Sequence, residues 1–575
     1  MKRVVHSTVL ISKLITTHLV NTLGVALLGA LFIFSFAPFY QGMLAIILPV
    51  IVLIITANLT SGQTFRRSWW FSFGYFVAAV YWIYFSMHVY YQVPLIATIA
   101  IIVGLASYLA LFPALAFWLS KKYSSKSKKI LLRASSGDAE DDSVLNITIS
   151  SSPYCEADYK AIKTIVSDEL GKSRQSKSKQ LFKGRKILVA GVSADITKLI
   201  VDKLEEKFNQ DIIWKKSLFG KVSALSKNSK YSTTGILLLL PAFWLIFEWL
   251  RSWLLSGFPW LAIGYSQSET ILANYAPVMG VYGIGWLVVT LGAIVYLLFA
   301  AQARILYAVL AVFSVSALLG ADLLCWIILA GILVYGLWLK KIYVIFGALL
   351  VLGALALSQL DWSKPSGNPL SIRLVQGNIH QGIKWTKLGK SLSASRYKMM
   401  SENLGDADLV IWPETAIPAF LDEIQAGYIR ELQQGLKDKN ASLLLGIPVA
   451  STREVRGKAK VVEFNSIIKL TADSLIRYDK THLVPFGEFM PFESVLGDFY
   501  DVFNVPGSDF AAGDTVQKPI VVKGHTIGIN ICYEIAFGRE MAKALPGAVF
   551  FINFSISARF LIFIIYSNSY LLRCS

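Results

Sequence analysis

Two apolar runs, Asp408-Leu-Val-Ile-Trp-Pro-Glu414 and Thr526-Ile-Gly-Ile-Asn-Ile-Cys532, each end in a reactive side chain. Short apolar runs bounded by polar residues are typical of buried strands. Further runs of this kind predict strands at 371–375, 442–446, 466–470, 519–522 and 548–552, and Asp422 to Lys437 predicts a helix. Strands with intervening helices indicate an α/β or layered α+β domain after residue 370.

Glu414, Lys480 and Cys532 are the candidate chemical groups of this domain. Taken singly, each is ordinary, because a lone strand cysteine is usually a buried structural thiol and a lone glutamate or lysine is usually solvated. Taken together, they are the residue set for acyl transfer through a thioester: a thiol nucleophile, a carboxylate base and a cation for the oxyanion. Their wide separation in the chain allows each to end a different strand, so that they converge in space.

The composition indicates a membrane protein. The chain has 575 residues, of which 55% are hydrophobic and only 16% charged, and its mean hydropathy is +0.54. Apolar stretches near the roughly 20 residues that cross a bilayer predict spans at 9–37, 41–58, 69–91, 94–119, 235–255, 271–300, 305–320, 322–339 and 342–359. The net charge is +18, and in a membrane protein excess Lys and Arg usually lie in cytoplasmic loops that face anionic lipid. No basic stripe interleaved with aromatic residues is present, so no nucleic-acid partner is predicted. The four cysteines are too scattered for a disulfide framework or a metal site.

Positive charge predicts the orientation of these spans. Basic clusters at Lys2/Arg3, Arg66/Arg67, from Lys121, at Arg304 and at Lys340/Lys341 all fall on one side, which the positive-inside rule makes cytoplasmic. Nine crossings from an inside N-terminus then put everything after residue 360 outside, in the periplasm of a Gram-negative cell. The first span is expected to be retained, since no cleavable signal peptide is evident.

The predicted organisation has five parts: transmembrane helices at 1–120, a basic cytoplasmic insertion at 121–234, transmembrane helices at 235–360, the catalytic domain at 368–556 and an atypical tail at 557–575. The insertion begins with a Ser/Lys-rich stretch that we expect to be flexible. From Arg185 onward its pattern reads as strand, helix, strand, so a small α/β module is an alternative to a solvated loop.

Several motifs resemble one known family. Trp412-Pro-Glu, Asp479-Lys-Thr-His-Leu-Val-Pro-Phe-Gly-Glu488 and Cys532-Tyr-Glu look like the three catalytic blocks of the nitrilase superfamily, which carry a Glu–Lys–Cys triad. Arg373-Leu-Val-Gln-Gly-Asn-Ile-His-Gln-Gly-Ile-Lys-Trp385 and Glu248-Trp-Leu-Arg-Ser-Trp-Leu-Leu-Ser-Gly-Phe-Pro-Trp260 resemble its membrane-bound branch, the apolipoprotein N-acyltransferases. The resemblance implies a multi-pass α-helical membrane domain and a periplasmic nitrilase-like α-β-β-α sandwich, in a protein of the inner membrane.

The resemblance also implies a ping-pong reaction that needs no cofactor, ATP or metal. Cys532, activated by Glu414, would take an acyl chain from a membrane phospholipid, with Lys480 stabilising the oxyanion. The thioester would then acylate the free amine of a diacylglyceryl-cysteine apolipoprotein, the last step of lipoprotein maturation. The resemblance gives supporting roles to these residues: Trp385 as an apolar gate, Tyr533 near the thioester, and Glu488 and Glu534 orienting Lys480 or shaping the pocket. The protein is expected to be a monomer. His482 is expected to be structural.

Two departures from the family leave alternatives open. The insertion at 121–231 is long, and after Ser555 the sequence no longer follows the family, so an inactive truncated homologue is one alternative. A membrane amidase that hydrolyses its thioester is a second alternative. A transporter or scaffold is the third, because intramembrane Glu248 and Arg251 could mark a polar path, although residues three apart on a helix can also pair locally.

Overall fold

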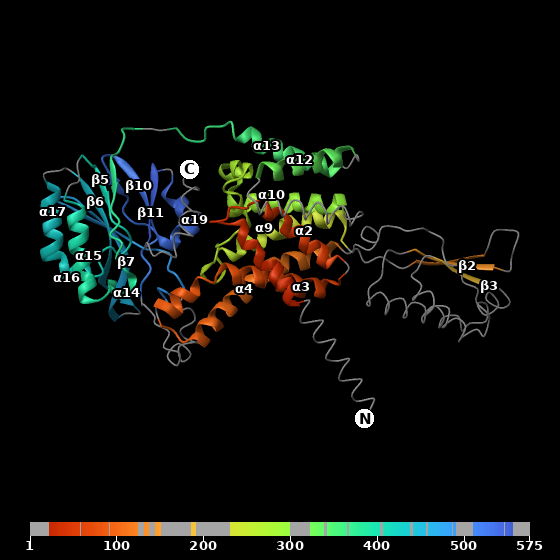
Figure 1. Ribbon diagram of the computed structural model, residues 1–575, viewed down its shortest axis with the longest axis horizontal. Coiled ribbons are helices and arrows are strands. Elements are labelled where there is room, and N and C mark those ends of the chain that lie inside the picture. The colour runs from red at the N-terminus through yellow and green to blue at the C-terminus, as the bar shows by residue number, and fades with distance from the viewer. Residues whose placement is uncertain are drawn as a thin grey trace, which may run out of the picture.

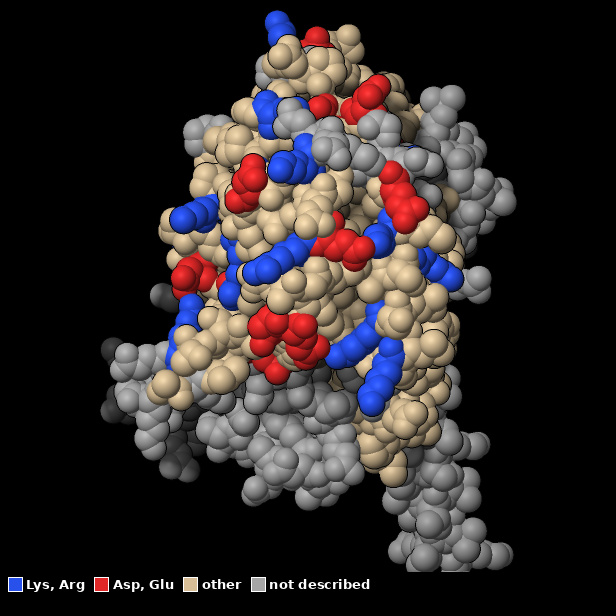
Figure 2. All heavy atoms as spheres, turned by 90° about the vertical axis from the view of Figure 1, so that its left-hand side faces the viewer, with Lys and Arg blue, Asp and Glu red and all other residues tan. Residues whose placement is uncertain are grey.

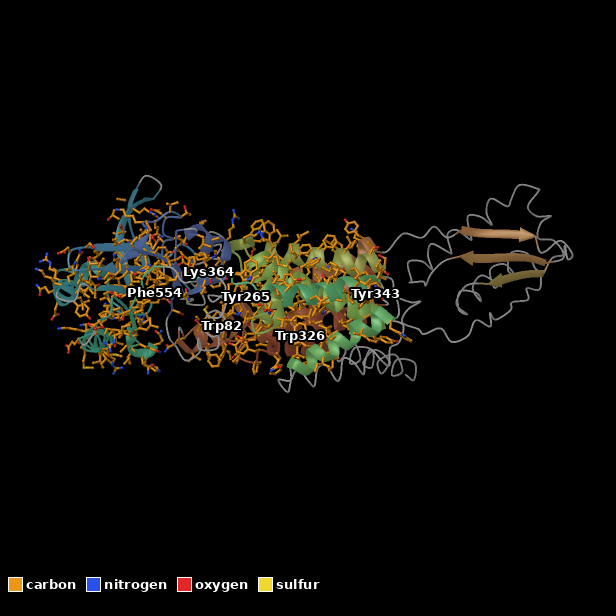
Figure 3. All side chains as sticks on the ribbon, turned by 90° about the horizontal axis from the view of Figure 1, so that it is seen from above. Trp82, Tyr265, Trp326, Tyr343, Lys364 and Phe554 are labelled. Carbon is orange, nitrogen blue, oxygen red and sulfur yellow. The ribbon has the colours of Figure 1, made fainter. Side chains whose placement is uncertain are left out.

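The computed structural model describes two adjoining domains (Figure 1). The described residues are 22–57, 59–90, 92–124, 231–299, 322–338, 342–364, 367–402, 406–437, 441–455, 458–485, 487–489, 510–545 and 547–555, with strands at 131–136, 144–150 and 186–190. A helical domain occupies the centre of the view, and an α/β domain lies beside it. Seen from above, Trp82 and Tyr265 lie at the end of the helical domain nearest the α/β domain, whereas Tyr343 lies toward the opposite end (Figure 3).

The helical domain is built from apolar helices of unequal length. Its elements are η1 (Leu31–Ser35), α2 (Leu44–Thr56), α3 (Ser61–Ala79), η2 (Phe85–Tyr90), α4 (Leu95–Ser124), η3 (Gly235–Leu239), α9 (Leu240–Arg251), η4 (Leu254–Ser256), η5 (Ile263–Gln267), η6 (Ile271–Tyr275), α10 (Ala276–Phe299), α12 (Asp322–Trp338) and α13 (Ile342–Leu357). Within the described ranges, two helical stretches are long and apolar enough to cross a membrane, Leu95–Ser124 and Ile271–Phe299. The number of spans stays a prediction.

One predicted span has the wrong boundaries. The expected span at 69–91 is instead helix α3, which ends at Ala79, followed by a turn and the short π-helix η2. The earlier start of α3, at Ser61, follows from a capping box that the hydropathy pattern does not reveal: the Thr60 hydroxyl accepts from the Gln63 amide N–H and the Gln63 side chain accepts from Thr60 N. The other predicted spans coincide with helices to within a few residues, except 305–320 and the start of 9–37, which lie outside the described residues.

The insertion contains a small sheet. Strands β1 (Leu131–Ser136) and β2 (Val144–Ser150) pair antiparallel, and β2 pairs parallel with β3 (Lys186–Ala190). The expectation of a flexible start stays a prediction, because residues 125–130 lie outside the described residues. Alternating Leu145, Ile147 and Ile149 give β2 the two-residue period of a strand, which the surrounding Ser and Lys residues obscured. The strand predicted from Arg185 is present as β3, and the predicted helix and second strand lie outside the described residues.

The α/β domain contains two sheets. Its elements are β4 (Ile372–Leu374), α14 (Gln381–Lys384), α15 (Lys387–Met400), β5 (Leu409–Ile411), α16 (Leu421–Ile424), η7 (Gln425–Ile429), α17 (Arg430–Lys437), β6 (Ser442–Val455), β7 (Lys458–Leu470), β8 (Leu475–Asp479), β9 (Ile520–Val522), β10 (His525–Ile531), η8 (Cys532–Ala536), α19 (Gly538–Met541), η9 (Ala542–Ala544) and β11 (Phe550–Phe554). One sheet has the order β4-β5-β6-β7-β8 and the other β11-β10-β9.

Period-2 burial sorts the strand side chains into two cores. On β5, Val410 packs with Tyr397, Leu432 and other residues of the helices, whereas its neighbour Leu409 packs with Ile529 of the second sheet. Both faces of β5 are therefore buried, which explains its unbroken apolar run. The described residues thus form a helix layer, a sheet and a second sheet, three of the four layers of the expected sandwich.

Strand directions bring the reactive residues together. Strands β5 and β6 are parallel, and β8 runs with them because the antiparallel strand β7 lies between β6 and β8. Parallel strands end at one edge of a sheet, so the residues after β5 and β8 meet there. Glu414 follows β5 and Lys480 follows β8, while Cys532 follows β10 of the second sheet.

Candidate active site

Glu414 is a buried carboxylate held by an amide. Its side chain is 3% exposed, and Glu414 Oε1 accepts a 2.7 Å hydrogen bond from Asn465 Nδ2 of β7. The turn that carries it passes so close to β6 that a Cβ on Gly446 would lie 2.6 Å from the Glu414 Cα. Only glycine fits at that position, so the local backbone sets where the carboxylate lies.

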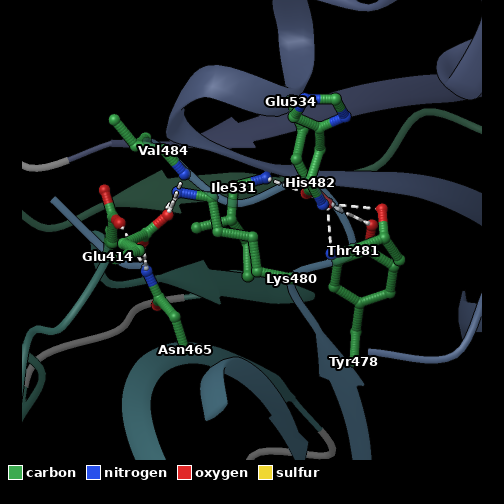
Figure 4. Close-up of polar contacts among 10 residues, drawn as sticks. Glu414, Asn465, Tyr478, Lys480, Thr481, His482, Val484, Ile531 and Glu534 are labelled. Atoms are coloured by element: carbon green, nitrogen blue, oxygen red, sulfur yellow. Dashed lines mark hydrogen bonds and ion pairs between the residues drawn. The ribbon is translucent and has the colours of Figure 1, made fainter. Parts of the chain in front are cut away.

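Lys480 is a buried ammonium with a dedicated counter-ion. Its side chain is 1% exposed, and its Nζ lies 2.8 Å from Glu488 Oε1 and 2.7 Å from Oε2. Asn465 links this pair to Glu414, because its Nδ2 also donates to Glu488 Oε1 at 3.0 Å. Val484 N donates to the other Glu488 oxygen at 2.8 Å (Figure 4). The expected supporting role of Glu488 thus has a geometry: it holds the ammonium in place.

Cys532 sits at a strained turn. Its φ of +53° is in the left-handed region, which non-glycine residues rarely adopt outside functional sites. The 3-10 turn η8 begins at this residue, directly after β10, and the free thiol is half-buried. A hydrogen bond with the Ser555 side chain, just after β11, favours the thiolate. Reactive nucleophiles are often presented on such sharp turns.

Glu534 ties the Cys532 turn to the Lys480 segment. Its Oε2 accepts from Ile531 N at 2.7 Å, and its Oε1 accepts from Thr481 N at 2.6 Å and from the Thr481 hydroxyl at 2.8 Å (Figure 4). His482 N donates to the same oxygen at 3.2 Å. Glu534 does not contact Lys480 directly in these bonds. It holds instead the backbone just before Cys532 and just after Lys480.

The remaining predicted residues lie around this centre. Tyr533 donates from its hydroxyl to Gly257 O of the helical domain at 3.2 Å. His482 pairs with Glu540 through Nδ1 at 3.0 Å and stacks on Phe537, the environment of a structural histidine. Trp385 caps α14 and is 54% exposed. Its role as a gate stays a prediction.

Two groups at the site escaped the sequence analysis. Asn465 bridges both carboxylates, and a polar residue just before the apolar run of β7 was its only signal. Lys384 is 6% exposed and lines a small hollow together with Glu414, Gln376 and Asn378. Burial lowers the pKa of Lys384 to about 8, although the charge of Glu414 opposes this change.

Burial and charge set the protonation of the centre. Burial, and after it the negative charge of Glu414, raise the pKa of Cys532 to about 12 against the opposing charge of Lys480. Burial also raises the pKa of Glu414, against the positive charge of Lys480. For Lys480, burial lowers the pKa, but the charges of Glu488, Cys532 and Glu414 outweigh it and hold the pKa above its ordinary value. The resting centre is therefore a neutral thiol beside a permanent cation.

Glu414 and Lys480 are buried, so they are not part of the charged outer surface of the domain. On the outer face of the α/β domain, Lys and Arg side chains are interspersed with Asp and Glu, without a broad region of one sign (Figure 2). Within the described part of the chain, no group of three or more His, Cys, Asp and Glu side chains is placed to hold a metal ion. The chemistry that this arrangement supports is nucleophilic: a thiol, a base and an oxyanion partner.

Comparisons with known proteins match both domains. Residues 28–136 and 215–294 match the apolipoprotein N-acyltransferase N-terminal domain, and residues 371–562 match the carbon-nitrogen hydrolase domain. The first match is interrupted at residues that belong to the insertion.

The curated relatives that this chain resembles are named apolipoprotein N-acyltransferase. Apolipoprotein N-acyltransferase of Methylococcus capsulatus is 33% identical over 56% of this chain and 56% of its own length. That of Chromobacterium violaceum is 34% identical, with 55% of its length covered, so the chain spans about half the length of these two relatives. That of Vibrio vulnificus is 27% identical over 92% of this chain and 76% of its own length. Matches to both domains in the expected order, and to relatives of one name, place the protein: the chain belongs to the apolipoprotein N-acyltransferase family.

Proposed function

We propose that this chain moves an acyl group from a membrane phospholipid to the N-terminal amine of a diacylglyceryl-cysteine apolipoprotein, through a thioester on Cys532. The observation that carries the proposal is the convergence of Glu414, Lys480 and Cys532 at the ends of β5, β8 and β10. Their electrostatic coupling supports it, since Glu414 and Lys480 are among the charges that act most strongly on the thiol.

The first half-reaction forms the thioester. Glu414 takes the proton of the Cys532 thiol while the sulfur attacks the carbonyl carbon of a phospholipid ester. Negative charge develops on the carbonyl oxygen, and the Lys480 ammonium, held by Glu488, stabilises it. The intermediate collapses by breaking the ester C–O bond. The departing glycerol oxygen takes the proton from Glu414, and a lysophospholipid leaves.

The second half-reaction forms the amide. The neutral amine of the acceptor attacks the thioester carbonyl, and Lys480 again stabilises the oxyanion. Glu414 accepts a proton from the attacking nitrogen, and the C–S bond breaks. The proton returns to the Cys532 sulfur, which restores the resting centre. A thioester is more reactive than an amide, so the step runs downhill without another energy source.

The proposed location is the inner membrane, with the catalytic domain on the periplasmic side. Contacts of α4 with α9 support this orientation: Tyr108 donates to Leu254 O near the α/β domain, and the Phe117 ring meets Trp244 further along. The two helices are thus antiparallel, and Lys121 and Lys122 lie in the last turn of α4, beyond Phe117 and away from the Leu254 contact. Basic residues at that end fit a cytoplasmic face.

The test is the intact mass of the detergent-purified protein after incubation with phosphatidylethanolamine, beside Cys532→Ala. The proposal predicts a gain of one acyl chain that hydroxylamine removes and that the alanine variant lacks. A synthetic diacylglyceryl-cysteine peptide should then discharge the adduct and gain the chain as an amide. Release of free fatty acid with the peptide unmodified would favour the amidase alternative, and absence of any adduct would refute the thioester.

A further inference from the structure

The loop between α9 and η5, residues 252–262, has an irregular backbone. Leu255, Ser256, Gly257 and Leu261 have φ values of 55°, 69°, 81° and 55°, all in the left-handed region. A Cβ on Gly257 would lie 2.1 Å from Ser252 O, so no other residue fits there without a shift. A backbone of this kind persists only where its surroundings hold it in place.

Side chains of the helical domain hold this loop by its carbonyl groups. Buried Arg251, 2% exposed, donates from Nη1 to Phe258 O at 2.9 Å and to Trp260 O at 2.7 Å. Tyr75 of α3 donates to Leu261 O at 2.9 Å. Tyr108 of α4 adds the bond to Leu254 O at 3.1 Å.

Arg251 is itself oriented by Glu248. Its Nη2 lies 3.7 Å from Glu248 Oε1, the same oxygen that accepts a 2.7 Å bond from Ile263 N just after the loop. The pair therefore holds the second half of the loop, at Phe258 and Trp260, and the backbone just after it, at Ile263. The sequence left two alternatives for Glu248 and Arg251, a polar transport path or a local pair, and the geometry is that of the local pair. The guanidinium of Arg251 also uses its fixed arrangement of donors to bind two carbonyl groups.

The 252–262 loop also contacts Tyr533, the residue next to Cys532. Gly257 O accepts the Tyr533 hydroxyl at 3.2 Å, and the Phe258 ring lies 6.3 Å from the Tyr533 ring. Tyr533 directly follows Cys532, whose turn is itself left-handed. Trp260, on the same loop, contacts Trp82, which lies at the junction of the two domains (Figure 3).

We propose that Arg251, with Glu248, is a positioning residue for Cys532, acting through the 252–262 loop and the Tyr533 hydroxyl. In this proposal the helical domain sets the orientation of the backbone turn that carries Cys532. The effect on acylation rests on the proposed function, but the effect on the Cys532 turn does not. The two can therefore fail separately.

The test is a double-mutant cycle of Arg251→Met and Tyr533→Phe in the full chain. Hydrogen exchange of the 532–537 backbone and the rate of acyl-adduct formation are measured for each variant. Both single variants should speed exchange in 532–537 and slow adduct formation about tenfold, because small misplacements of a reacting group are costly. The double variant should be no slower than the worse single one, since both changes break one chain of contacts.

Two further variants keep the test decisive. Tyr108→Phe removes one bond to the loop and serves if Arg251→Met does not fold. Tyr275→Phe is the matched control, because its hydroxyl donates to Leu350 O, away from the loop. Exchange in 532–537 that stays at the wild-type rate when the loop itself exchanges faster would overturn the proposal, as would effects that multiply in the double variant. A wild type without any adduct but with coupled exchange would refute only the proposed function.

Discussion

The protonation state of Cys532 gives the sharpest prediction. Burial and the neighbouring Glu414 raise the pKa of this thiol to about 12, even with Lys480 close by. The resting nucleophile should then be a thiol that loses its proton only during attack. This differs from thiol enzymes in which a cation stabilises a preformed thiolate. The perturbations that separate these cases are pH and the substitution Glu414→Gln.

The magnitude follows from the pKa. At pH 7 a thiol with a pKa of about 12 is ionised in roughly one molecule in 10⁵, which corresponds to about 7 kcal/mol that a general base must offset. Between pH 9 and 10.5 its thiolate fraction should rise about thirtyfold. An ordinary cysteine, with a pKa of roughly 8.5, would rise by only about 1.3-fold over that interval because it is already mostly ionised.

The assay is brief alkylation with iodoacetamide, followed by mass measurement of the peptide that contains Cys532. The background variant has Cys155, Cys325 and Cys574 replaced by alanine, so that a single thiol reacts. In Glu414→Gln the loss of the carboxylate charge should lower the pKa of Cys532 and increase alkylation at pH 9. The same substitution should slow acylation by phospholipid about 10²- to 10⁴-fold, because the base is gone.

These two opposite effects of one substitution make the reasoning easy to refute. A wild-type alkylation rate that levels off below pH 9 would mean a preformed thiolate. Slower alkylation of Glu414→Gln at pH 9 would mean that the carboxylate does not raise the pKa of the thiol. Acylation unchanged in that variant would remove Glu414 as the base.

Three further predictions test the surroundings of the triad. Lys480→Met should abolish measurable acylation and cost about 3–5 kcal/mol of unfolding free energy, because it leaves Glu488, 13% exposed, without its cation. Lys384→Met should raise stability at pH 7 by up to about 3 kcal/mol; the lowered pKa means that the folded state disfavours the charged amine, so the gain should shrink as pH rises from about 8 toward 10.5. Gly446→Ala should lower acylation at least about tenfold, since its Cβ would lie 2.4 Å from Pro413 O, whereas Gly435→Ala, with open space around it, should be neutral or slightly stabilising. Thermal unfolding and adduct formation check all three.

Apolar periodicity predicted the sheet framework well but missed one decisive strand. The runs around β5, β6 and β10 stand out because both of their faces meet apolar cores. Strand β8, which delivers Lys480, has only half-buried residues and sits at the edge of its sheet. Its sequence, Leu475-Ile-Arg-Tyr-Asp479, therefore lacks a continuous apolar run. Motif resemblance, rather than the strand pattern, located the lysine.

The contacts that organise the site were beyond the reach of the sequence. Asn465 is 51 positions from Glu414 and 23 from Glu488, so nothing local reveals that one amide serves both. The same holds for Tyr533 and Gly257, which are 276 positions apart and belong to different domains. Residue types could be predicted from motifs because chemistry fixes them, whereas their supports depend on the register and crossing of elements that only the fold supplies.

Glu534 shows why these supports matter for the reaction. Lys480 and Cys532 come from different sheets, so relative movement of the sheets would change the distance between the thiol and its cation. Glu534 accepts from the backbone of Ile531, at the end of β10, and of Thr481, in the turn after β8, one bond on each side of this gap. Burial raises its pKa, and the bonds from Thr481 and Ile531 oppose that rise, which marks them as bonds to the charged form. The carboxylate therefore links the two sheets. The strained φ of Cys532 is tolerated because Glu534 holds the backbone next to it.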